Sequence, residues 1–98
     1  MTINKKQNGS DLEIALGGRL DTTTAPELEA ALNQSLDGVT RLTINLADIL
    51  YISSAGLRVL LSAQKRMNKQ GEMKVTNVNE AVMEIFEVTG FADILTIE

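Results

Sequence analysis

Apolar and polar residues alternate along four stretches of the chain, as they do in strands that bury one face. The alternation is clearest within residues 12–20 and 39–46, where leucine or isoleucine recurs at alternate positions. Residues 72–78 repeat it in a shorter form. Residues 1–7 are a weaker strand candidate, which the turn residues 8–11 join to the next strand as an antiparallel hairpin. The pattern therefore predicts four strands.

The second strand is followed by apolar residues at helical spacing, which predict a helix that begins at Thr24. Thr24 and Glu27 fit the S/T-x-x-E capping box, and Pro26 lies in the first turn, where its missing N–H is harmless. Because this box already caps the helix, we expect the fold not to depend on Asp21.

A second helix, after residues 39–46, has one apolar and one basic face. Ser53 or Ser54 supplies its N-cap hydroxyl, and Gly71 is expected to end it as a left-handed C-cap residue. No acidic residue occurs between Ile49 and Gly71, so the positive end of the helix dipole would attract an anion at Ser54. The outer face carries Arg58, Ser62, Lys65, Arg66 and Lys69.

A third, short helix is capped by Asn79 and closed by Gly90, and residues 91–97 are expected to form a turn and a last strand. The alternation of strands and helices predicts an α/β fold. It consists of a mixed β-sheet of four to five strands with three to four helices packed on it. Gly17 and Gly18 indicate a bulge in the second strand or a close approach of another backbone.

Composition narrows the possible functions of the chain, which we take as one domain spanning residues 1–98. The absence of Cys and His excludes zinc fingers, disulfide scaffolds, thiol chemistry and His-based catalysis. The carboxylates are scattered, so we expect neither an enzyme nor a metal or cofactor site. A net charge of −4 argues against nucleic-acid binding. We see no signal segment and no apolar run of ~20 residues, and we expect a cytoplasmic protein without membrane insertion.

Residues 51–57, Tyr-Ile-Ser-Ser-Ala-Gly-Leu, resemble the signature of STAS domains, as found in bacterial anti-sigma factor antagonists. The usual form is Asp-Ser-Ser/Thr-Gly-Leu-Gly, in which the serine after the Asp accepts a phosphoryl group. Aligning on Gly56 places Ser54 at that position. The departures are Ser53 in place of Asp, Ala55 in place of a hydroxyl residue, and Arg58 in place of Gly.

Two further segments extend the resemblance to nearly the whole chain. Gly-Arg-Leu-Asp at residues 18–21 is similar to the family's Gly-Glu-Leu-Asp, with Arg19 in place of Glu, and residues 88–91 resemble the family's usual ending. In the family the aspartate of the first segment lies near the acceptor serine. We expect residues 21–24 and 48–54, which follow adjacent strands, to meet at one edge of the sheet.

The resemblance implies an anti-sigma factor antagonist in a partner-switching system. The unphosphorylated protein would bind an anti-sigma factor that is an ATP-dependent serine kinase. Phosphorylation of Ser54, with Ser53 as second choice, would release it, and a serine phosphatase of the metal-dependent type would reset it. The residues expected at the partner surface are Asp21, Thr22, Thr23, Ser53, Ser54, Ala55, Gly56 and Arg58.

Each of these residues also has a simpler interpretation. Ser54 would be an ordinary helix cap, Asp21 a polar turn residue, and Arg58 a solvated charge instead of a contact for an anion one helical turn away. The corresponding alternative function is a constitutive STAS interaction subunit, for example of a transporter, without phospho-switching.

Overall fold

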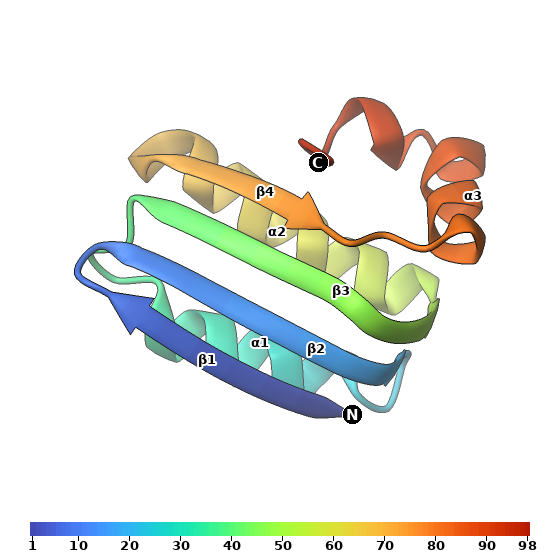
Figure 1. Cartoon of the computed structure of the whole chain (residues 1–98), viewed down its shortest axis with the longest axis horizontal. Helices are drawn as coiled ribbons and strands as arrows, with labels where there is room; N and C mark the ends of the chain where they lie inside the picture. The colour runs from blue at the N-terminus through green and yellow to red at the C-terminus, as the bar shows by residue number, and fades with distance from the viewer.

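An antiparallel hairpin opens the fold in the computed structural model, which describes residues 1–98 (Figure 1). Strand β1 (Thr2–Asn8) pairs with β2 (Asp11–Leu20) around a turn at Gly9 and Ser10. Gly9 has a φ of 63°, a conformation that glycine adopts at little cost. The predicted hairpin is confirmed.

The parallel part of the sheet follows from two strand–helix–strand units. The sheet order is β1-β2-β3-β4, with β3 parallel to both β2 and β4. A short 3₁₀ helix, η1, comes after the last α-helix. The predicted α/β order and mixed sheet are confirmed. The remaining elements are α1 (Ala25–Ser35), β3 (Arg41–Ile52), α2 (Ser54–Gln70), β4 (Glu72–Thr76), α3 (Glu80–Thr89) and η1 (Phe91–Asp93).

Helices α1 and α2 cover one face of the sheet and leave much of the other face open, while α3 lies beside the end of β4 (Figure 1). Burial follows the alternation of the strands, because every second side chain points toward the helices. The buried apolar residues that carry this pattern are Leu12, Ile14, Leu16, Leu42, Ile44, Leu46, Met73 and Val75.

Strand β3 is longer than the predicted residues 39–46, and it runs to Ile52. The register shifts twice, between Ala15 and Gly17 and between Gly18 and Arg19, and each time the extra residue is in β3. The bulges therefore lie in β3 and not, as predicted, in the second strand. These bulges break the period of two, so that Ile49 and Ile52 are the next buried positions. Residues 48–52 are therefore strand and not loop, and only Ser53 separates β3 from α2.

The end of α2 and the end of β4 also differ from the prediction. Gly71 ends α2, but its φ is 172°, so the expected left-handed C-cap is wrong. Glycine is still required, because a Cβ there would overlap the carbonyl of Thr40. Strand β4 stops at Thr76 instead of residue 78, since Asn77 has a positive φ of 57°.

Both ends of α3 follow the prediction, and the tail follows it in part. Asn79 caps α3 by accepting the N–H of Val82 at 2.9 Å, and Gly90 closes it in the left-handed conformation. The tail forms η1 and a single parallel bridge from Ile97 to Val75, in place of a full last strand. None of the helices combines the length and the apolar character that a membrane crossing requires.

Candidate functional site

The serine pair lies where β3 passes directly into α2. Ser53 is the N-cap, because its Oγ accepts the N–H of Gly56 at 3.4 Å. Its side chain is half-buried. Ser54 is the first residue of the helix; it is exposed, and its hydroxyl makes no hydrogen bond within the chain. The cap is therefore Ser53, and the hydroxyl of Ser54 is free.

The start of α2 favours negative charge beside Ser54. The helix is 17 residues long and has no acidic residue in its first turn. The backbone N–H groups of Ser54 and Ala55 have no acceptor within the chain. Free N–H groups and the helix dipole both attract an anion at this end.

The end of β2 adjoins the same point. Leu20 and Ile52 are register partners in the parallel pair, and the N–H of Ser53 donates to the carbonyl of Leu20 at 2.9 Å. The chain therefore leaves β2 and β3 side by side, and residues 21–24 follow directly from a residue bonded to Ser53. The two segments meet at one edge of the sheet, as parallel pairing predicts.

Gly56, expected at the partner surface, is buried against the end of β2. A Cβ at this position would lie 2.6 Å from Cγ of Leu20, 2.9 Å from the Leu20 carbonyl oxygen and 3.1 Å from Cγ2 of Ile52. Glycine thus allows the first turn of α2 to pack directly on the sheet. Its visible role is packing, which fixes where Ser53 and Ser54 stand.

The predicted capping box of Thr24 and Glu27 is wrong. Thr24 precedes α1, but its side chain does not cap the helix. Its Oγ1 instead donates to the carbonyl of Arg19 at 2.7 Å and accepts the N–H of Asp21 at 2.9 Å. Oδ1 of Asp21 accepts the N–H groups of Thr23 at 3.0 Å and Thr24 at 3.1 Å. Asp21 therefore holds the loop, contrary to the expectation that it leaves the fold unaffected.

These hydrogen bonds also keep Asp21 ionised. The hydrogen bond from the Thr24 N–H has the largest effect, and the Thr23 N–H, the Thr24 hydroxyl and the Arg19 cation act in the same direction. Together they outweigh desolvation and lower the pKa of Asp21 below its ordinary value of 3.8. An Asp three residues before a Thr at a helix start was the available sequence signal, because each side chain can accept the backbone N–H of the other.

Arg19 and Tyr51 belong to the site, although the sequence did not indicate them as a pair. They are register partners on β2 and β3, and Cζ of Arg19 lies 4.6 Å from the centre of the Tyr51 ring. Nε of Arg19 is 3.7 Å from Oδ2 of Asp21. Leu50, next to Tyr51, is 72% exposed. Only the bulged register of β3 brings Arg19 opposite Tyr51.

The other predicted partner residues are mostly accessible. Thr22 and Thr23 are exposed and Ala55 is half-buried. Arg58 is exposed, lies one helical turn after Ser54, and makes no hydrogen bond or ion pair within the chain. Among the basic residues of α2, Arg66 differs, because its Nη2 donates to Asp37 at 2.7 Å.

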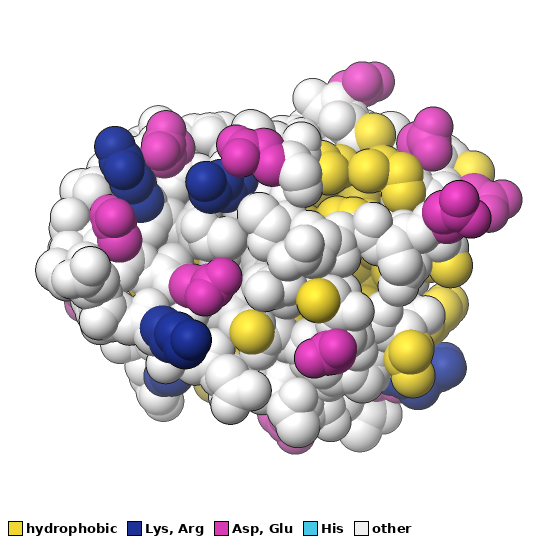
Figure 2. All heavy atoms as spheres, in the orientation of Figure 1, with side chains coloured by type: hydrophobic (Ala, Val, Ile, Leu, Met, Phe, Trp, Pro, Cys, Tyr) yellow, Lys and Arg dark blue, Asp and Glu magenta, His cyan; other side chains and the backbone are white.

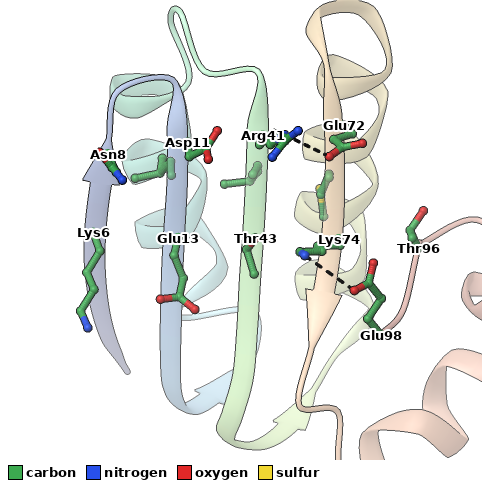
Figure 3. A pocket seen from close by; sticks show the side chains of 13 residues that line it. Lys6, Asn8, Asp11, Glu13, Arg41, Thr43, Glu72, Lys74, Thr96 and Glu98 are labelled. Carbon is green, nitrogen blue, oxygen red and sulfur yellow. Dashed lines mark ion pairs between the residues drawn. The ribbon is translucent and has the colours of Figure 1, made fainter.

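A shallow hollow of about 430 Å³ lies on the open face of the sheet, away from the serines (Figure 3). It is near the first residues of β2, β3 and β4, whereas Ser54 lies beyond the opposite end of β3. Four of its charged residues form two ion pairs, Arg41 with Glu72 and Lys74 with Glu98. Figure 2 shows basic and acidic side chains interspersed over this part of the face, while apolar side chains gather beside α3 and the tail.

Nowhere do three potential metal-ligating side chains come together.

Comparison with known proteins gives concordant results. The STAS domain model matches residues 2–98. The anti-sigma-B factor antagonist of Bacillus subtilis (strain 168) is 33% identical over 98 residues, which are 99% of this chain and 90% of that protein. The unphosphorylated anti-sigma factor antagonist SpoIIAA superposes with a TM-score of 0.85 at 17% identity, over 99% of this chain and 88% of the other. The phosphorylated form of the Bacillus cell fate determinant SpoIIAA gives 0.77 at 16%, over 99% and 91%.

Proposed function

The chain belongs to the STAS domain family, and from this we propose that it is an anti-sigma factor antagonist that works by partner switching. In this proposal the unphosphorylated form binds an anti-sigma factor, which is itself an ATP-dependent serine kinase, and the sigma factor is released. Phosphorylation of Ser54 dissociates the complex, and a metal-dependent serine phosphatase removes the phosphate so that the protein can bind again.

The observation that carries the proposal is that only one of the two serines is used as the helix cap. Ser53 is occupied as the helix cap, while Ser54 presents a free, exposed hydroxyl at the positive end of α2. A kinase needs an accessible acceptor oxygen, and a phosphate needs surroundings that tolerate its charge. Ser54 meets both requirements without any rearrangement of the cap.

The proposed switch depends on a difference between the fold and the interface. At the start of a helix an anion is stabilised by roughly 0.3 to 1 kcal/mol, so the phosphorylated protein should remain folded. At a docking surface the same phosphate brings about two negative charges that must lose water and face groups suited to a neutral hydroxyl. A cost of about 3 kcal/mol there weakens binding more than a hundredfold.

The proposal is tested by incubating the protein with its cognate anti-sigma factor and Mg-ATP, and measuring both phosphate incorporation and complex. Wild type should take up one phosphate and lose the complex, whereas Ser54→Ala should take up none and stay bound. Ser53→Asn is the matched control, since asparagine also caps helices well but has no hydroxyl. This variant should still be phosphorylated.

Each other result has a defined meaning. If Ser53→Asn alone abolishes the phosphate, the acceptor is Ser53. If wild type binds the anti-sigma factor but neither wild type nor Ser53→Asn is phosphorylated, the protein is a constitutive STAS interaction subunit. If wild type does not bind the anti-sigma factor at all, the antagonist function is refuted.

A further inference from the structure

We propose that Arg19, held against Tyr51, is a docking group that binds a carboxylate of the partner protein beside Ser54. This inference rests on the proposed function, since it names the chemistry of the surface that the anti-sigma factor would present. It concerns the unphosphorylated complex.

The hydrogen-bonding groups of the Arg19 side chain are available to a partner. The guanidinium is planar and has five N–H donors around its edge. Its Cζ lies over the Tyr51 ring, 4.6 Å from the ring centre. The approach of Nε to Oδ2 of Asp21, at 3.7 Å, is too long for a hydrogen bond, and the side chain makes none elsewhere in the chain. Arg19 therefore carries an oriented cation whose donors are unused.

Arg19 and Tyr51 lie on the open face of the sheet at the edge where the serines stand. Their neighbours Leu20 and Ile52 are buried, so alternation directs Arg19 and Tyr51 to the opposite face from the helices. Tyr51 precedes Ser54 by only three residues. A partner that covers the start of α2 and extends over the end of β3 would therefore contact both.

Two of the exposed residues at this point, Arg19 and Tyr51, are of the types that contribute most to interfaces. The Arg19 side chain is 61% exposed, and Tyr51 and Leu50 are 39% and 72% exposed. Tyrosine and arginine are enriched among residues that dominate binding energy. The ring also limits the freedom of the guanidinium, so less conformational entropy is lost when the partner binds.

The charge of the site indicates an acidic contact. Oδ1 of Asp21 already accepts two backbone N–H groups, and its charge is partly offset by Arg19. The charged side-chain donors without a hydrogen-bond acceptor at the site belong to Arg19 and to Arg58, which are both cations. A carboxylate matches the edge of a guanidinium with two parallel hydrogen bonds. The phosphate of Ser54 itself has the same chemistry and is the competing occupant.

The test measures Kd for the cognate anti-sigma factor by calorimetry in a Ser54→Ala background, which removes phosphorylation. Arg19→Gln should weaken binding about tenfold, and Arg19→Glu more. Tyr51→Phe should keep the affinity because the ring remains, whereas Tyr51→Ala should lower it. Arg41→Glu is the matched control, since Arg41 is an exposed arginine, 67% accessible, at the opposite end of the sheet. This control should change Kd less than twofold.

The possible outcomes separate this inference from the proposed function. If the Ser54→Ala parent does not bind, the antagonist function is refuted and this inference with it. If the parent binds and Arg19→Glu behaves like Arg41→Glu, or binds more tightly, only the carboxylate contact is wrong. Arg19→Gln could instead lower the melting temperature of the phosphorylated wild-type protein alone and leave Kd unchanged in the Ser54→Ala background. That result would assign Arg19 to the phosphate and overturn the proposal.

Discussion

Replacing Gly56 by alanine tests whether the position of the serines is fixed by the contact between α2 and the end of β2. The change adds one methyl group at a buried position without altering charge or hydrogen bonding. The methyl carbon would lie 2.6 Å from Cγ of Leu20 and 2.9 Å from its carbonyl oxygen. That oxygen accepts the N–H of Ser53 at 2.9 Å, so it cannot move without disturbing the helix start.

The expected change in the free energy of unfolding of Gly56→Ala is the difference between two opposing effects. Overpacking a well-packed site costs about 1–3 kcal/mol. Alanine in place of glycine inside a helix recovers at most about 1 kcal/mol. Because the clash involves a backbone atom of a fully buried residue, Leu20, the clash should prevail. We expect a net loss of about 1–2 kcal/mol, which lowers the melting temperature by about 5–15 °C in a domain of this size.

Thermal unfolding of Gly56→Ala beside Ser62→Ala measures this directly. Ser62 is exposed on the same helix, so its replacement gains helix propensity without a clash. Ser62→Ala should melt at or slightly above the wild-type temperature. A Gly56→Ala protein that melts as high as wild type would refute the close approach of α2 to Leu20, and with it our account of why glycine occurs there.

Two further predictions concern charges near the serines. Because hydrogen bonds lower the folded-state pKa of Asp21 below 3.8, its ordinary value, its contribution to stability is present above that pH and is lost as the pH falls through the folded-state pKa. Asp21→Asn should therefore melt below wild type at pH 7, with the gap closing in acid; a constant gap would contradict this. Arg58→Ala should destabilise only the phosphorylated protein, by ~0.5 kcal/mol, because the pair with the phosphate is exposed. Equal shifts of melting temperature in both forms would exclude the pairing.

The fold was predictable where one local rule acts alone. Alternation identified the strands, the turn at Gly9 identified the hairpin, and the amide-capping residue Asn79 located the start of α3. Each of these depends on residues close in sequence. The resemblance at residues 51–57 located the serines, and the structure adds which of the two is the cap.

The prediction was incomplete where distant residues decide the local structure. The end of β3 was placed too early, because the bulges opposite Gly17 and Gly18 change which of its side chains are buried. The capping box does not form, since Thr24 exchanges hydrogen bonds with Asp21 and also donates to the carbonyl of Arg19. The contact of Arg19 with Tyr51 requires the exact register of two parallel strands, which no pattern within one strand specifies.

The central claim is that phosphate on Ser54 abolishes partner binding while leaving the fold intact. The most direct test compares Kd for the cognate anti-sigma factor, and the melting temperature, of the unphosphorylated and the Ser54-phosphorylated protein. We predict a Kd more than a hundredfold higher for the phosphorylated form, with a melting temperature equal to or slightly above that of the unphosphorylated form. Equal Kd values, or weak binding that accompanies loss of the folded state, would contradict the claim.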